Sequence, residues 1–100
     1  MRRGAPIEYK TKRPMEGEVV GFVEKAAGAT NFMVKCSDGN DRICTIPGRL
    51  RRQFWIKQGD VVLVKPWVVQ TNERGDIVWR YSKLDVEWLK KSGYLGSLAL

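Results

Sequence analysis

The stretch that decides the fold is "FMVKCSDGNDRICTIP", from Phe32 to Pro47. Its first residues alternate, with Phe32, Val34 and Cys36 on one face and more polar side chains on the other, as in a half-buried β-strand. Asp38-Gly39 is a strong signal for a tight hairpin turn. "DRICTIP" then returns as a second strand. The stretch therefore predicts an antiparallel hairpin near the centre of the chain.

One further strand is expected before this hairpin and another after it. "GEVVGFVE", residues 17–24, precedes it, and Gly21 inside this run indicates a bend or a bulge. "GDVVLVKPWVVQ", residues 59–70, follows it as a long apolar strand. Pro66 interrupts this strand, because proline cannot donate to a sheet ladder, so a sharp bend or an edge position is expected there.

The C-terminal part of the sequence predicts one more strand and then a helix. In "DIVWRYS", residues 76–82, alternation places Trp79 and Tyr81 in the core and Arg80 on the opposite face. Ser82 can cap a following helix, because Asp85 stands three residues on, close to a capping box. Gly93 is a suitable stop for this helix.

Five strands with the longest connection between the third and the fourth fit a small closed barrel, since closure removes exposed strand edges. The five-stranded OB-fold has this order, and a chromo- or SH3-like barrel is the structural alternative. We therefore expect an all-β chain with a C-terminal helix. Its parts are a flexible basic arm at residues 1–13, an OB-fold barrel at 14–82, and a helix with a short apolar tail at 83–100.

Composition narrows the class of partner. The chain has 100 residues, which suits one domain, and a formal net charge of +7. Such a balance favours a polyanionic partner, although a basic protein that is merely soluble is the alternative. No apolar run approaches the roughly 20 residues that span a bilayer, and the N-terminus lacks the apolar core of a signal peptide. We expect a cytoplasmic monomer without a membrane partner.

The polar residue types argue against catalysis and metal binding. The chain has no histidine, which removes the commonest general base. Its two cysteines, Cys36 and Cys44, are too few for a zinc site and are expected to be small buried thiols, although a hairpin disulfide stays open. The acids are scattered along the sequence. We therefore expect no enzymatic activity, no cofactor and no metal.

The connection "PGRLRRQFWIKQGD", from Pro47 to Asp60, is the main candidate for nucleic-acid contact. It has room for one helical turn, and no acid appears before its last residue. Arginine forks match phosphate oxygens, and exposed rings offer stacking surfaces for bases. The alternative is that the aromatic rings of this connection pack into the open end of the barrel. We expect at least one of the two rings to do so. The cations are Arg49, Arg51, Arg52 and Lys57, and the rings are Phe54 and Trp55.

Two smaller groups of cations lie elsewhere. Lys35 and Arg42 flank the Asp38-Gly39 turn and are expected to form a positive patch on the face that OB-folds use, with an ordinary solvated face as the alternative. Lys65, Arg74 and Arg80 belong to the fourth and fifth strands and their connection. Arg74 equally suits an ion pair with a neighbouring acid of its turn. All five cations are candidate nucleic-acid contacts.

The residues also resemble a known family. "CSDGNDRICTIPGRLRRQFWIKQGDVVLVKPW" (36–67) and "GDIVWRYSKLDVEWLKKSGYL" (75–95) are similar to archaeal translation initiation factor 1A, an S1-like OB-fold family. This resemblance implies binding to rRNA at the A site of the small ribosomal subunit, recruitment of initiator tRNA, and cooperation with other initiation factors in start-site selection. Carried onto this chain, it implies rRNA contacts at Arg42, Arg49, Arg51, Arg52, Trp55 and Lys57.

The sequence departs from the resemblance at two places. The end "GYLGSLAL" lacks the acidic tail of eukaryotic relatives, and the loop "AGATN" lacks a basic residue that the resemblance leads us to expect. Three other classes compete with the initiation factor. They are a generic single-stranded RNA-binding OB domain or RNA chaperone, an enzyme or enzyme subunit, and a membrane-surface role of the helix. The small number of plausible exposed rings argues against a generic RNA-binding domain. The missing histidine and the lack of clustered acids argue against an enzyme, and the short, partly acidic helix argues against a membrane-surface role.

Overall fold

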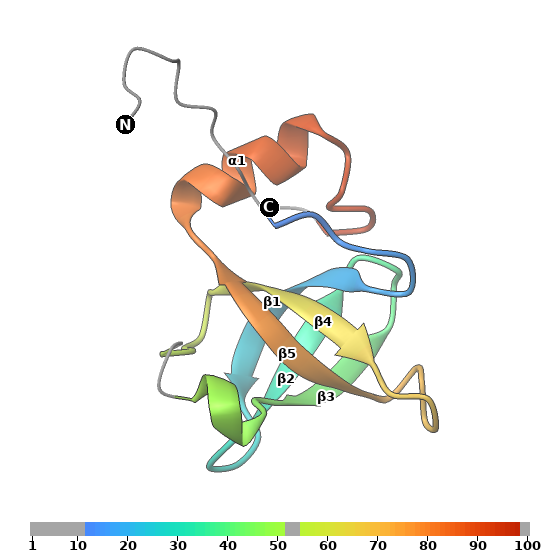
Figure 1. Cartoon of the computed structure of the whole chain (residues 1–100), viewed down its shortest axis with the longest axis vertical. Helices are drawn as coiled ribbons and strands as arrows, with labels where there is room; N and C mark the ends of the chain where they lie inside the picture. The colour runs from blue at the N-terminus through green and yellow to red at the C-terminus, as the bar shows by residue number, and fades with distance from the viewer. Residues whose placement is uncertain (1–11, 52–54, 99–100) are drawn as a thin grey trace.

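Five strands close into a barrel in the order β1-β2-β3-β5-β4, and a helix covers one end of it (Figure 1). The computed structural model describes residues 12–51 and 55–98. All neighbouring strands are antiparallel except β3 and β5, which are parallel. The elements are β1 (Val19–Ala26), β2 (Asn31–Cys36), β3 (Asp41–Thr45), η1 (Gly48–Leu50), β4 (Val61–Pro66), β5 (Arg74–Tyr81) and α1 (Lys83–Lys91). The predicted OB-fold barrel with a C-terminal helix is confirmed.

The central hairpin forms as its sequence predicts. Strand β2 pairs with β3, with Lys35 opposite Asp41 and Val34 opposite Arg42. Gly39 has φ 91°, the left-handed region that glycine enters without a steric penalty. The Asp38 carboxylate accepts a hydrogen bond from the Asn40 backbone N–H at 3.2 Å, which helps to fix the turn.

The described residues form two apolar clusters, one inside the barrel and one between the barrel and the C-terminal helix and tail. Strand β4 contributes to both, because Val62 and Val64 face the interior while Val61 and Leu63 lie beneath the helix. Its continuous apolar run is thus buried on both faces. The interior cluster consists of Val23, Phe32, Val34, Cys36, Cys44, Ile46, Val62, Val64 and Ile77.

The assignment of Trp79 to the core is wrong. Leu63 pairs with Trp79 and Val64 with Ile77, so Val78 is an extra residue that makes a bulge in β5. The bulge breaks the alternation: Ile77 lies in the barrel interior, and Tyr81 joins the cluster under the helix. Trp79 remains 37% exposed, and the Lys12 ammonium lies 5.5 Å from its ring centroid.

Strand β1 also differs from the expectation at Gly21. The register shift in β1 lies between Val23 and Lys25, not at Gly21. Gly21 instead permits close strand packing, since a Cβ there would collide with the Val34 side chain. At the other predicted irregularity, Pro66 is the last residue of β4 and ends the strand rather than bending a longer one.

The C-terminal helix is capped as predicted and the tail folds back on the barrel. The Ser82 hydroxyl accepts from the Asp85 N–H, and the Asp85 carboxylate accepts from the Ser82 N–H, which completes a capping box. Gly93, with φ 79°, follows the end of the helix. Leu95 and Leu98 are buried in the cluster under the helix, and the Ser97 N–H donates to the Ser37 carbonyl at 3.0 Å.

The start of the described chain is tied to the same end of the molecule. The Tyr81 hydroxyl donates to the Lys12 carbonyl at 2.5 Å. The Arg13 guanidinium lies 5.4 Å from the ring centroid of Trp88, which stacks on Tyr94. Burial raises the pKa of Tyr81 well above its usual range.

Among the described helices, none is long and apolar enough to cross a membrane.

Candidate nucleic-acid interface

The connection between β3 and β4 closes one end of the barrel with aliphatic side chains and leaves a tryptophan outside. Leu50 and Ile56 pack against the interior cluster. Trp55 is 83% exposed, so it does not plug the barrel. The expected helical turn is present as η1, with the N–H of Leu50 donating to the Pro47 carbonyl at 2.9 Å. Arg52 and Phe54, both named as candidates from the sequence, lie outside the described residues.

Arg51 and Trp55 border the same hollow. This hollow of about 260 Å³ lies where the connection meets the loop between β1 and β2, and its lining residues are Ala29, Thr30, Phe32, Ile46, Arg51, Trp55 and Ile56. The Arg51 Nε donates to the Ile46 carbonyl at 3.2 Å, which fixes the root of its guanidinium. Arg49, in η1, is exposed. The connection therefore presents two arginines and one ring on one solvent-facing segment.

Lys57 and Arg80 meet at a shared carboxylate. The Lys57 Nζ lies 3.2 Å from Asp60 Oδ1, and an Arg80 terminal nitrogen lies 3.9 Å from Asp60 Oδ2. The Lys57 backbone N–H also donates to Asp60 at 2.9 Å. Asp60 is thus the first acid after the cationic run, and it holds the end of the connection against β5. Two cations around one carboxylate leave a local positive excess.

The expected patch of Lys35 and Arg42 does not form, and that expectation is wrong. Lys35 is exposed and lies 3.7 Å from the Glu24 carboxylate. The side chain of Arg42 is only 1% exposed and points inward beside the cysteines of β2 and β3. Strand alternation explains this, because Arg42 shares its face with the buried Cys44 and not with Lys35.

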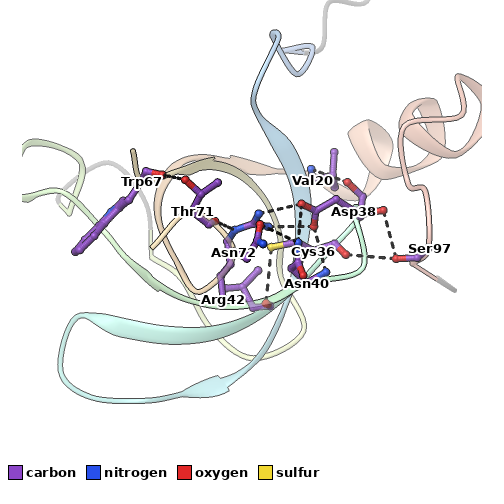
Figure 2. Close-up of polar contacts among 11 residues, drawn as sticks. Val20, Cys36, Asp38, Asn40, Arg42, Trp67, Thr71, Asn72 and Ser97 are labelled. Atoms are coloured by element: carbon purple, nitrogen blue, oxygen red, sulfur yellow. Dashed lines mark hydrogen bonds and ion pairs between the residues drawn. The ribbon is translucent and has the colours of Figure 1, made fainter. Parts of the chain in front are cut away.

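Arg42 instead joins two hairpin turns (Figure 2). Its two terminal nitrogens donate to both oxygens of Asp38 at 3.0 and 2.9 Å, and its Nε donates to the Thr71 carbonyl at 2.7 Å. Asn40 adds a hydrogen bond to the Asn72 side chain at 3.3 Å. The β2–β3 turn and the β4–β5 turn are therefore held together by a buried guanidinium.

The electrostatics of this network follow from its hydrogen bonds. The Arg42 hydrogen bonds lower the pKa of Asp38 below its usual value. Burial acts to lower the pKa of Arg42, but its hydrogen bonds to Asp38 and to the Cys36 thiol outweigh burial and raise that pKa. Arg42 thus stays charged in the interior because Asp38 is held close to it.

The two cysteines are free and buried, as expected. A hydrogen bond from the Cys44 thiol lowers the pKa of Cys36 against the effect of burial, and the nearby Arg42 adds to the lowering. The hydrogen bond to Cys36, together with burial, raises the pKa of Cys44. Among the described residues there is no group of three or more metal-ligating side chains.

The remaining two candidates lie at the β4–β5 hairpin, away from η1. Lys65 is exposed at the end of β4. The Arg74 guanidinium lies 4.7 Å from the ring centroid of Trp67, and its Nε is buried without a hydrogen-bond partner in the described chain. Arg74 therefore stacks on a tryptophan rather than forming the ion pair that the sequence left open.

The sequence candidates thus separate into distinct places. Arg49, Arg51 and Trp55 lie on the connection, Lys57 and Arg80 lie around Asp60, and Lys35 lies on β2. Arg42, Lys65 and Arg74 lie at the β2–β3 and β4–β5 hairpins, and Arg52 lies outside the described residues. Sequence reasoning did not place Ala29 and Thr30 in the hollow beside Trp55. Their small neutral side chains carry no signal of their own, and only the barrel geometry brings them there.

Comparison of the chain with known proteins identifies the family to which it belongs. The family model described as translation initiation factor 1A / IF-1 matches residues 7–98. The chain belongs to this family. Translation initiation factor 1A of Methanococcus maripaludis (strain C7) is 47% identical over 90 residues, covering 90% of this chain and 86% of that protein. The one from Methanopyrus kandleri is 50% identical over 86 residues, covering 86% and 77%.

A solved structure agrees with the family assignment. The solution structure of a bacterial translation initiation factor of this family, from the Wolbachia endosymbiont strain TRS of Brugia malayi, is 34% identical, with a TM-score of 0.51. The match covers 66% of this chain and 78% of that one. Membership of the translation initiation factor 1A / IF-1 family gives the chain a role in translation initiation. It is a family of initiation factors rather than of enzymes.

Proposed function

We propose that this chain binds rRNA at the A site of the small ribosomal subunit, and thereby promotes recruitment of initiator tRNA and selection of the start site. The observation that carries this proposal is the exposed Trp55 beside Arg51, on a connection with four cations and no acid before Asp60. The family supports a role in initiation, and this connection supplies the chemistry for holding RNA.

The arginines would hold phosphates and the tryptophan would hold a base. Arg49 and Arg51 present planar guanidinium groups that can donate to two phosphate oxygens at once. Trp55 offers a flat face at the rim of the hollow, and stacking on such a ring contributes roughly 1–3 kcal/mol per base. Arg52 of the same connection is included in the proposal by its sequence position. Lys57, Arg80 and Lys35 would add outer phosphate contacts.

Occupation of the A site would act by exclusion. While the connection is seated on rRNA, an elongator tRNA cannot enter the same site, and the initiator tRNA and the other initiation factors assemble beside it. In this proposal, residues 14–82 form the RNA-binding barrel and residues 83–100 cover its far end. The basic residues of segment 1–13 would add electrostatic attraction. The chain would bind as a monomer.

The test is co-sedimentation with purified archaeal small ribosomal subunits in the presence of excess unstructured RNA. The variant replaces Arg49, Arg51 and Arg52 by alanine. We expect stoichiometric binding that resists the competitor, and its loss in the variant. The slope of log Kd against log salt should also fall by about 0.7 for each phosphate contact removed.

A matched control removes the same charge from another surface. Lys83, Lys90 and Lys91 belong to α1, and all three are exposed. Their replacement by alanine should leave subunit binding close to that of the unchanged protein. Both variants are first shown to be folded by thermal melting. Equal losses in the two variants would mean that net charge alone drives binding, and release by the competitor would point to a generic single-stranded RNA-binding OB domain.

A further inference from the structure

Asp60 is the one acid in the connection between β3 and β4, a segment that carries four cations. An acid repels phosphates, so on charge alone Asp60 would weaken the binding of RNA. Its side chain is only 12% exposed, however, and three groups of the protein surround its carboxylate. These are the backbone N–H and the ammonium of Lys57, at 2.9 and 3.2 Å, and the Arg80 guanidinium at 3.9 Å. Asp60 therefore faces the protein rather than a ligand.

The hydrogen bonds of Asp60 close a turn over residues 57–60. Its backbone N–H donates to the Lys57 carbonyl at 3.1 Å, while its carboxylate accepts from the Lys57 N–H. Gly59, with φ 93°, takes the left-handed conformation that this turn requires. The turn is also joined to β1, because the Gly59 N–H donates to the Val23 carbonyl at 2.8 Å and the Val23 N–H donates to the Asp60 carbonyl at 2.9 Å.

The position of Trp55 depends on the residues that follow it. Its side chain is 83% exposed and so contributes little to its own orientation. The next residue, Ile56, packs against the interior cluster, and the backbone of Lys57 is held by the Asp60 carboxylate. These two successive anchors fix the backbone from which the Trp55 ring reaches the rim of the hollow.

Two opposing effects decide what Asp60 does for RNA binding. Its charge repels phosphates, but Lys57 and Arg80 already offset that charge, and salt screens interactions between exposed charges beyond about 8 Å. Without its hydrogen bond, the backbone at Lys57 would gain freedom in the unbound protein, and ordering it again on binding would lower the affinity. Because the charge is largely offset and the backbone restraint is not duplicated by another printed bond of the Lys57 N–H, positioning outweighs repulsion.

We propose that Asp60 is a positioning residue of the RNA-binding connection. It raises the affinity for rRNA by holding the backbone of Lys57, and with it the Trp55 ring, in the orientation that binds. It acts through its hydrogen bond to the Lys57 N–H rather than through its charge, and it does not touch RNA. This inference rests on the proposed function. The Lys57 side chain is 63% exposed, so its ammonium can still meet a phosphate on its outer side.

The test compares two variants of Asp60 that have the same net charge. Asp60→Asn and Asp60→Ala each raise the net charge from +7 to +8, but only asparagine keeps an oxygen that can accept from the Lys57 N–H. Binding to purified archaeal small subunits is measured below the melting temperature of each variant. We expect Asp60→Ala to raise the Kd on the order of tenfold, and Asp60→Asn to stay within about twofold of the unchanged protein.

A third variant measures the effect of charge alone. Asp41 is an exposed acid at the start of β3, and Asp41→Ala raises the net charge by the same amount as the variants of Asp60. We expect its affinity to equal or slightly exceed that of the unchanged protein. The slope of log Kd against log salt should stay unchanged in Asp41→Ala. In Asp60→Ala it should fall by about 0.7, because Lys57 no longer meets its phosphate.

Fluorine NMR of the free protein separates positioning from a loss of stability. 5-Fluorotryptophan labels the four tryptophans, and Trp55→Phe assigns the signal of Trp55. We expect this signal to shift in Asp60→Ala and to keep its place in Asp60→Asn, while the signals of Trp67 and Trp88 stay unchanged in both. A role in stability alone would lower the melting temperature without a selective shift at Trp55 and without a change in the affinity of the folded protein.

Three results would overturn the inference. Binding of Asp60→Ala as tight as that of the unchanged protein, or tighter, would show that this acid only repels RNA. Equal losses in Asp60→Ala and Asp60→Asn would show that the charge is needed and not the hydrogen bond. An unshifted Trp55 signal in Asp60→Ala would show that the ring is positioned by other contacts. The proposed function survives all three, whereas failure of the unchanged protein to bind subunits would contradict the proposed function and this inference together.

Discussion

At the scale of single residues, Arg42 shows why a charge in a strand is a poor sign of exposure. Its position two residues before Cys44 places it on the inner face, and alternation predicts this. Arginine is rarely buried unless it is paired, so the sequence alone favours an outer position. The partner, Asp38, lies four residues earlier, across the hairpin turn, and only the folded turn brings both carboxylate oxygens within reach.

Replacement of this buried cation should be costly. Arg42→Met removes hydrogen bonds to Asp38 and to the Thr71 carbonyl, so we expect the free energy of unfolding to fall by about 3 kcal/mol. Urea unfolding measures this change. Arg80→Met is the control, since Arg80 is partly exposed and its contact with Asp60 is 3.9 Å long, and it should cost under about 1 kcal/mol. Similar losses in both variants would contradict a special role for Arg42.

The same pair gives a prediction about pH. Arg42 lowers the pKa of Asp38 in the folded state. A lowered folded pKa adds stability above the unfolded pKa of about 3.9, and this contribution is lost as the pH falls through the folded value. The difference in unfolding free energy between the unchanged protein and Asp38→Asn should therefore be steady near neutral pH and shrink below about pH 4. A difference that grows on acidification would contradict this direction.

At the scale of elements, local signals were sufficient where contacts are local. Asp38-Gly39 predicted the hairpin, and Ser82 with Asp85 predicted the start of α1, because each signal and its hydrogen-bond partners lie within a few residues. The bulge at Val78 left no such signal. It depends on how β5 pairs with β4, so alternation placed Trp79 in the core when it lies partly exposed.

Helix α1 should contribute to stability through one side chain above all. Leu89 is fully buried between the helix and the barrel, whereas Leu84 on the same helix is 62% exposed. Leu89→Ala should lower the free energy of unfolding by about 2–5 kcal/mol, and Leu84→Ala by less than about 1 kcal/mol. Chemical denaturation compares the two identical substitutions. A small effect at Leu89 would show that the helix is not firmly docked.

At the scale of the whole molecule, the barrel could be predicted from the number of strands and the long third connection, because closure removes strand edges. The packing of the C-terminal tail against the barrel could not be predicted in this way. Leu95 and Leu98 pack in a cluster with residues of β1 and β4, and the Ser97 hydroxyl donates to the Cys36 carbonyl. The sequence "GYLGSLAL" contains no signal that predicts these contacts. The separation of the cations of the β3–β4 connection from those at the β4–β5 hairpin likewise depends on which side chains the barrel buries.

The central claim is that this initiation factor occupies the A site, and competition with tRNA tests it most directly. The labelled protein is bound to small subunits carrying an mRNA and initiator tRNA, and an elongator tRNA matching the A-site codon is then titrated in. We predict mutual exclusion, with the apparent Kd of the protein rising in proportion to elongator tRNA, while a non-matching tRNA has no effect. Simultaneous binding of protein and matching elongator tRNA would contradict the account.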